Sequence, residues 1–138
     1  MAIALVANVA LANATSGTTT PDINTTGASL LVACITDYSG QSAAVLSDNK
    51  GNGTWTALTS YVQGIVRQTI YYKANPTVGS GHNFSIDGTN GFVNLCVATF
   101  SGVATTSPQD QSNGGTAGAG VSTVQPGSIT PSEDNELI

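Results

Sequence analysis

The sequence predicts an all-β fold, an antiparallel β-sandwich or jelly-roll-like barrel with about seven or eight strands. Ser, Thr, Gly and Asn account for 60 of the 138 residues, and 40% of the residues are hydrophobic. The hydrophobic residues gather in short runs rich in Val, Leu, Ile and Tyr, a composition that favours strands separated by turns. No window places apolar residues at the i, i+3, i+4, i+7 spacing of an amphipathic helix over a useful length.

The first part of the chain predicts two strands and the start of a third. Residues 3–11 alternate loosely between apolar and polar and are expected to form the first strand. Residues 15–27 are rich in Thr, Ser and Gly and predict a loop. The continuous apolar run at 30–36 is typical of a strand covered on both faces. After a loop at 38–43, another strand is expected to begin at 44–47.

The middle of the chain begins with a dense group of turn-forming residues at 48–53. Residues 54–59 then alternate with period two, which places Thr on one face and Trp55 on the other. Residues 67–73 have the β-branched and aromatic composition of a strand. We therefore expect a tight hairpin at 48–53.

The last third predicts fewer elements. A short strand is expected at 83–87, followed by a turn at 87–91 and a strongly apolar strand at 92–100. Residues 101–120 predict a loop, because large side chains are scarce there. A weak strand is expected within 121–130.

The length predicts one sandwich domain over residues 1–125, followed by a tail or the start of a second module at 126–138. A Thr-Pro turn and a polar spacer precede Leu137, as they also precede Leu30, which favours a cut from a longer parent. The apolar start of the chain, with Ala12 and Ala14 spaced as at a signal-peptide cleavage site, offers a secretory signal as an alternative to a strand. The absence of a positive charge before it favours the strand.

The charge excludes several classes of partner. Three basic residues against eight acidic ones give a net charge of −5. No basic patch can neutralise several phosphates, so we expect no nucleic-acid binding and no membrane-surface binding. No apolar run reaches the ~18–20 residues needed to span a bilayer.

The two cysteines, Cys34 and Cys96, each lie within an apolar, strand-like run. They are expected to be either two buried free thiols, which we favour, or one disulfide between strands. Two cysteines and the distant His82 lack the spacing of a zinc site, so no metal and no cofactor is expected.

The sequence offers no catalytic constellation, and we expect no enzyme. His82 is the only histidine; it lies in a Gly-rich stretch and is interpreted as a solvated loop residue. The match of 48–59 to a calcium loop is weak, because Lys50 and Thr59 occupy ligand positions. Five aspartates lie beside turn residues, where they are expected to cap turns: Asp22, Asp37, Asp48, Asp87 and Asp110. The glutamates Glu133 and Glu136 are expected in an exposed tail.

Aromatic residues are the one indication of a binding surface. The candidates cluster in one third of the chain: Trp55, Tyr61, Tyr71 and Tyr72. Tyr71 and Tyr72 point to opposite faces of a strand, so one of them is expected outside, where it could stack a sugar ring or contact a protein. The alternative, which we favour, places Trp55 and Tyr72 in the core.

Three segments together resemble a loose group of β-sandwich modules found in bacteriophage and prophage structural proteins and in bacterial surface proteins. They are residues 46–56, with an Asp-x-x-Gly-Asn-x-x-Trp pattern, residues 98–111 and residues 125–131. The resemblance implies an immunoglobulin-like or jelly-roll-like sandwich in a virion or extracellular assembly. It carries no catalytic residues. The immunoglobulin tyrosine corner is missing, because Asn94 stands two residues before Cys96.

Three functions follow as hypotheses. The first is a non-enzymatic assembly module, such as a phage tail, fibre or capsid-surface component, whose partners are other protein subunits joined by strand pairing at residues 3–11 or at 137–138. The second is a carbohydrate-binding module that uses the aromatic residues to bind glycans. A hydrolase fragment ranks last, because ionisable groups are few and lie in turns.

Overall fold

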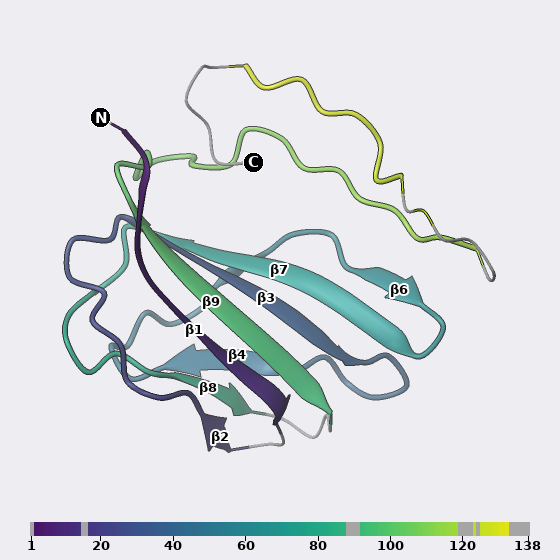
Figure 1. The fold of residues 1–138 in the computed structure, drawn as a ribbon, viewed down its shortest axis with the longest axis horizontal. Helices are drawn as coiled ribbons and strands as arrows, with labels where there is room; N and C mark the ends of the chain where they lie inside the picture. The colour runs from purple at the N-terminus through teal and green to yellow at the C-terminus, as the bar shows by residue number, and fades with distance from the viewer. Residues whose placement is uncertain (1, 15–16, 88–91, 119–122, 124, 133–138) are drawn as a thin grey trace.

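The computed structural model describes residues 2–14, 17–87, 92–118, 123 and 125–132. These residues form nine strands in two antiparallel sheets and no helix, which confirms the predicted all-β sandwich (Figure 1). The strands are β1 (Ala4–Ala14), β2 (Thr18–Thr19), β3 (Leu30–Tyr38), β4 (Val45–Asp48), β5 (Thr56–Ala57), β6 (Tyr61–Gln63), β7 (Val66–Ala74), β8 (Phe84–Asp87) and β9 (Val93–Ser101). The finer choice between an immunoglobulin-like and a jelly-roll-like type stays a prediction.

The larger sheet has the strand order β1-β9-β3-β7-β5, and β6 also pairs with β7. The smaller sheet has the order β2-β8-β4 and packs against one face of the larger (Figure 1). The predicted loop at 15–27 contains strand β2 and an isolated bridge between Ile23 and His82. The chain therefore passes repeatedly from one sheet to the other.

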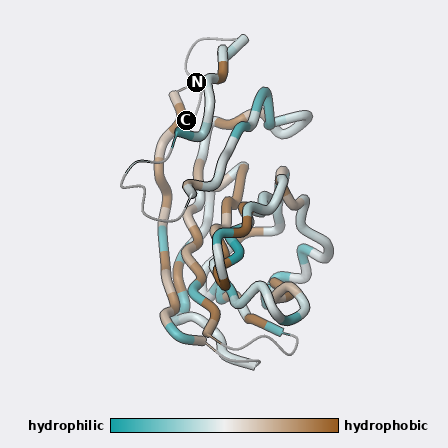
Figure 2. The backbone as a smooth tube through the Cα atoms, turned by 90° about the vertical axis from the view of Figure 1, so that its right-hand side faces the viewer, coloured by the Kyte–Doolittle hydropathy of each residue, from teal (hydrophilic) through white to brown (hydrophobic). Residues whose placement is uncertain are grey.

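The core lies between the two sheets, where alternate residues of facing strands meet. Its buried members include Leu31, Ala33, Ile35, Leu46, Trp55, Phe84, Ile86, Val93, Leu95 and Val97. Hydrophobic segments lie along the strands of both layers in Figure 2. The prediction that 30–36 is covered on both faces is wrong: Val32 and Cys34, on the outer face, are only half-buried. No second layer of strands among the described residues covers that face.

The predicted turn at 48–53 is present, but it is not a hairpin. It joins β4 to β5, and these strands belong to different sheets. The Asp48 carboxylate accepts hydrogen bonds from the backbone N–H of Lys50 (2.8 Å) and from the side-chain amide of Asn52 (3.1 Å). These bonds make an Asx turn, so Asp48 does cap the turn in which it lies. A true two-residue hairpin turn occurs instead between β6 and β7, where Gly64 has a φ of 59°.

The segment after β9 carries no strand at residues 102–118, 123 and 125–132. Its two arms run beside each other and are joined by side-chain hydrogen bonds (Figure 1). Asn113 donates to the carbonyl of Ser128 (3.2 Å), and Asp110 accepts from the backbone N–H of Ser132 (2.7 Å). The weak strand predicted within 121–130 is absent from the described part of that range. Residues 133–138, which include Glu133, Glu136 and Leu137, lie outside the described residues.

Candidate functional site

Strand β1 forms one edge of the larger sheet. It pairs with β9 from Ala4 opposite Ser101 to Ala14 opposite Val93, and no other strand in the described ranges pairs with it. Its eleven residues, ALVANVALANA, include no charged residue and no proline. Edge strands usually carry such residues because they block pairing with another chain. This edge lacks these two protections; its irregularities are two register shifts with β9, between Leu5 and Ala7 and between Leu11 and Ala14.

The backbone hydrogen bonds of a central antiparallel strand alternate between its two neighbours, and two backbone contacts fix the alternation in β3. Ser39 donates to the carbonyl of Ile65 on the β7 side, and the carbonyl of Ile70 in β7 accepts from Leu58 on the β5 side, which leaves the odd-numbered residues of β7 to face β3. Odd-numbered residues of β3 therefore bond β7 and even-numbered residues bond β9. The registers of β9 with β3 and with β1 extend this alternation to β1. Residues 7, 9 and 11 of β1 therefore form their backbone hydrogen bonds with β9. The N–H and C=O groups of residues 8 and 10 face the open edge.

The inner-face side chains of β1 are incompletely covered. Val6, Val9 and Leu11 pack against the core yet remain partly exposed, because β1 has a neighbouring strand on one side only. Leu5 lies on the outer face opposite Phe100 and is 55% exposed. An added strand could cover this apolar surface.

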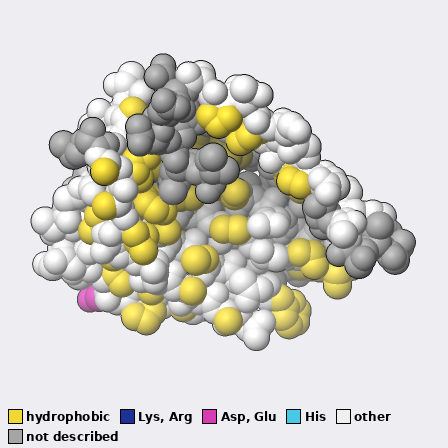
Figure 3. All heavy atoms as spheres, turned by 45° about the horizontal axis from the view of Figure 1, so that its top comes forward, with side chains coloured by type: hydrophobic (Ala, Val, Ile, Leu, Met, Phe, Trp, Pro, Cys, Tyr) yellow, Lys and Arg dark blue, Asp and Glu magenta, His cyan; other side chains and the backbone are white. Residues whose placement is uncertain are grey.

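The outer face of the larger sheet carries few charges. Register places Val32 beside Tyr72 and Cys34 beside Ile70 on this face, and Ile70 is 39% exposed. Figure 3 shows hydrophobic side chains gathered over the face toward which the C-terminal segment turns, with hardly any charged side chain among them. The surface is therefore suited to contact with protein or sugar and unsuited to binding phosphates.

The four candidate aromatic residues occupy different places. Trp55 is buried in the core and meets the ring of Phe84 edge-on, with ring centroids 6.1 Å apart. Tyr71 lies opposite Ala33 on the inner face, and Tyr72 lies on the outer face, so the expected opposite orientation is confirmed. Trp55 in the core agrees with the favoured alternative, but Tyr71 and not Tyr72 packs against that core. Both Trp55 and Tyr71 line a hollow of about 470 Å³ between β4 and the facing strands.

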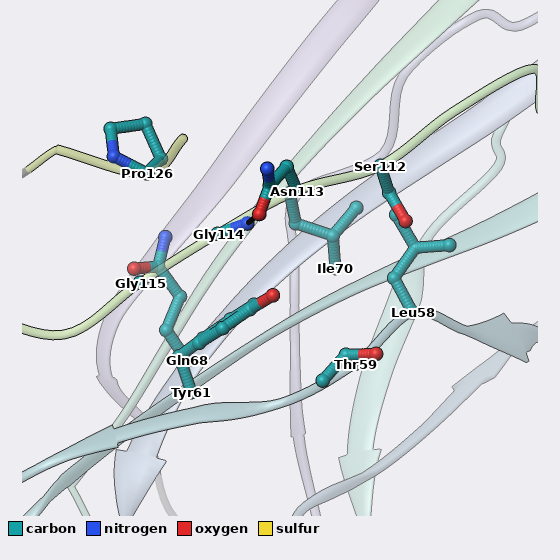
Figure 4. Close-up of a pocket in the computed structure, with 10 residues that line it drawn as sticks. All are labelled: Leu58, Thr59, Tyr61, Gln68, Ile70, Ser112, Asn113, Gly114, Gly115 and Pro126. Carbon is teal, nitrogen blue, oxygen red and sulfur yellow. Dashed lines mark hydrogen bonds between the residues drawn. The ribbon is translucent and has the colours of Figure 1, made fainter. Parts of the chain in front are cut away.

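Tyr61 lies in a cleft of about 260 Å³ between the larger sheet and the C-terminal segment (Figure 4). The floor is apolar, from Leu58 and Ile70, and the rim is polar: Thr59, Gln68, Ser112 and Asn113. Gly114 rests so closely on the Tyr61 ring that an added Cβ would clash with the ring carbons. The protein's own backbone thus occupies the surface that a sugar would stack on.

His82 is fully buried, so its interpretation as a solvated loop residue is wrong. Its Nδ1 lies 2.9 Å from the hydroxyl of Thr25, its Nε2 lies 3.5 Å from Asp48 Oδ1, and its ring stacks on Phe84 at 4.5 Å. Burial lowers the pKa of His82 below 6.5, and the nearby Asp48 carboxylate opposes that shift only in part. The cluster of His82, Thr25, Asp48 and Phe84 connects the loops at residue 25 and at 79–82 to the turn at Asp48. Because its imidazole has no access to solvent, it cannot reach a substrate.

Asp37 is another residue that sequence reasoning misplaced. It does not cap a turn but lies buried in β3, opposite Arg67 of β7. The two side chains form a two-point ion pair, with Arg67 Nε 2.8 Å from Oδ1 and a terminal guanidinium nitrogen 2.9 Å from Oδ2. Asp37 also accepts from the backbone N–H of Ala44 at 2.8 Å. The indication in the sequence was that Asp37 and Arg67, which carry opposite charges, each adjoin or begin a strand-forming run.

Cys34 and Cys96 are both free thiols, as the favoured alternative held. They are not buried, however: Cys34 is half-buried and Cys96 is exposed, both on the outer face of the larger sheet. They lie directly opposite each other in the register of β3 and β9. The side-chain amide of Gln68 donates to the sulfur of Cys34 at 3.3 Å.

The described residues contain no group of three or more His, Cys, Asp or Glu side chains arranged to hold a metal ion. Within the same residues, no helix is long and apolar enough to cross a membrane. Comparison of the chain with protein-family models, curated proteins and solved structures found no match. The resemblance to phage and surface-protein modules, and the virion or extracellular setting that it implies, stay predictions.

Proposed function

We propose that this protein is a non-enzymatic assembly module that joins a neighbouring copy by pairing its β1 strand with β1 of that copy. The observation that carries the proposal is the β1 edge of the larger sheet, which is unpaired among the described residues, free of charge and proline, and in regular register with β9 from Ala7 to Leu11. Strand addition of this kind satisfies backbone N–H and C=O groups that would otherwise bond water. Pairing around a two-fold axis continues the larger sheet from one subunit into the next.

The composition of β1 supports pairing with itself. An antiparallel arrangement with the two-fold axis at Ala10 places Asn8 opposite Ala12 and Val9 opposite Leu11 of the second copy. The outer-face pairs are then small or neutral, and the inner-face pairs are aliphatic. No like charges face each other, although each chain carries a net charge of −5.

A proline at residue 10 tests the proposal, because the N–H of Ala10 faces the open edge and is not used by β9. We expect the wild-type chain to form dimers whose fraction rises with concentration in analytical ultracentrifugation. Ala10→Pro should shift it to monomer while the unfolding midpoint changes little, since edge strands tolerate proline where the N–H faces solvent. Ala10→Val keeps the N–H and should still dimerise. A wild-type chain that stays monomeric at the highest attainable concentration would contradict the proposal.

A second candidate, carbohydrate binding, is favoured by the aromatic and amide lining of the Tyr61 cleft. Amide and hydroxyl groups beside an aromatic ring are suited to sugar hydroxyls and to the apolar face of a sugar. The C-terminal segment would have to shift from Tyr61 to admit a pyranose ring. A glycan array with the wild-type chain and Tyr61→Ala separates the two outcomes: binding that disappears in the variant supports this site, and no binding removes it.

A further inference from the structure

Cys34 and Cys96 form a pair that no function proposed above uses. They belong to adjacent central strands, β3 and β9, and face each other in register. The alternation of backbone bonds makes residue 34 one that bonds β9, so the two cysteines are a hydrogen-bonded antiparallel pair. Such pairs have Cα atoms about 5.5 Å apart, within the ~4.4–6.8 Å that a disulfide spans.

We propose that Cys34 and Cys96 are a reversible modification site, a dithiol that a small disulfide of the glutathione class oxidises to a cross-strand disulfide. Cβ atoms of directly opposed residues lie about 4.5–5.5 Å apart, with hydrogen-bonded pairs at the wider end, whereas a disulfide needs about 3.8 Å. The two strands must therefore draw together locally when the bond forms. Strained and exposed disulfides are the easily reduced ones, so the bond is expected to be labile and not a permanent staple.

The difference in solvent exposure between the two cysteines indicates which thiol reacts first. The thiolate of Cys96, the more exposed residue, attacks one sulfur of the oxidised glutathione and releases the first glutathione thiolate. The thiolate of Cys34 then attacks the Cys96 sulfur of the mixed disulfide and releases the second. The two protein thiols lose two electrons and two protons, and the glutathione disulfide is reduced to two glutathione thiols. The Gln68 amide, 3.3 Å from the Cys34 sulfur, provides a donor to the negative charge on the resolving thiolate.

Intact-mass spectrometry of the folded full-length chain after incubation with oxidised glutathione tests this site. We expect the wild-type monomer to lose the mass of two hydrogen atoms and to regain it when reduced glutathione is added. Cys34→Ser should stop at a stable glutathione adduct on Cys96, since the resolving thiol is missing. Cys96→Ser should form an adduct on Cys34 more slowly than Cys34→Ser forms one on Cys96.

Three outcomes would overturn the proposal: a persistent glutathione adduct on the wild-type chain, two unreacted thiols, or a disulfide only between two chains. Both single variants replace a thiol by a hydroxyl of similar size at a surface that is not fully buried, so folding should be retained. A thiol count on the urea-unfolded wild-type chain confirms that both cysteines entered the experiment reduced.

Discussion

Nε2 of His82 lies 3.5 Å from Oδ1 of Asp48, and both side chains are fully shielded from solvent. The other imidazole nitrogen, Nδ1, forms a hydrogen bond with the hydroxyl of Thr25. The negative charge of Asp48 favours a protonated imidazole, but it does not outweigh the cost of burying that charge. The pKa of His82 is therefore lowered. The ring is therefore neutral in the folded protein near neutral pH.

The first prediction is a loss of stability on mild acidification. Below pH 6.5 the unfolded chain takes up a proton on His82 more readily than the folded chain does. The free energy of unfolding must then fall as the pH drops through 6.5 toward the lowered pKa of the folded state. Urea unfolding at about pH 7.5 and about pH 5.5 measures the loss, in a range where Asp and Glu stay ionised. His82→Gln should lack this dependence; a wild-type chain that gains stability at the lower pH would show that Asp48 dominates.

The second prediction concerns the buried Asp37–Arg67 ion pair. Asp37→Asn keeps an acceptor for the Ala44 N–H but leaves the guanidinium without a counter-charge, which should cost about 3–5 kcal/mol. The double variant Asp37→Asn/Arg67→Gln removes both charges and should lose less than the sum of the two single variants. Chemical unfolding of all four chains gives the coupling energy. Losses that add within about 0.5 kcal/mol would mean that the pair is not coupled.

The third prediction separates Trp55 from Tyr72. Trp55→Ala empties a large core position beside Phe84 and should lower the free energy of unfolding by about 3–5 kcal/mol. Tyr72→Ala, on the outer face, should cost no more than about 1–2 kcal/mol. Thermal and urea unfolding of the two variants provide the comparison. Equal, small losses would place Trp55 on the surface and revive it as a ligand platform.

The fourth prediction concerns the contact between Gly114 and Tyr61. A Cβ at residue 114 would clash with the Tyr61 ring, so Gly114→Ala should force the C-terminal segment and this ring apart. Limited proteolysis near residues 110–115 should then become faster, while the unfolding midpoint of the sandwich changes little. Gly79→Ala is the matched control, because a Cβ added at residue 79 would lie 3.8 Å from the nearest heavy atom outside its chain neighbours, on the Lys50 side chain. Unchanged proteolysis in Gly114→Ala would mean that the contact with Tyr61 does not hold the segment against the sheet.

The long strands could be predicted from sequence because their patterns are internal to them. The apolar runs at 30–36 and 92–100 correspond to β3 and β9 with shifts of no more than two residues at either end. The two-residue strand β2 left no such pattern, since its pairing depends on the strand beside it. Strand β5 lies within the period-two alternation at 54–59 but covers only two residues of it. The turn at 48–53 was evident from its residue types, but nothing local indicated that it crosses between sheets.

The contacts of the candidate site were harder to predict from the sequence, because the register between paired strands brings their residues together. Cys34 meets Cys96, and Asp37 meets Arg67, through strand pairings between residues far apart in the chain. His82 is buried where its loop bridges to Ile23 and its ring stacks on Phe84, whereas its Gly-rich surroundings suggested the opposite. The absence of protective charges in β1 could be read directly, but its position at the edge could not.

The pairing of β1 with β9 has a consequence for biosynthesis. Ala7 bonds Thr99, which the ribosome adds 92 residues later. The first long strand therefore emerges from the ribosome with no partner and stays uncovered until nearly the whole sandwich has been translated. Closing contacts between such distant segments is slow, so a nascent chain of this protein has a long interval in which that aliphatic segment can be held by a chaperone or captured by a neighbouring ribosome's product.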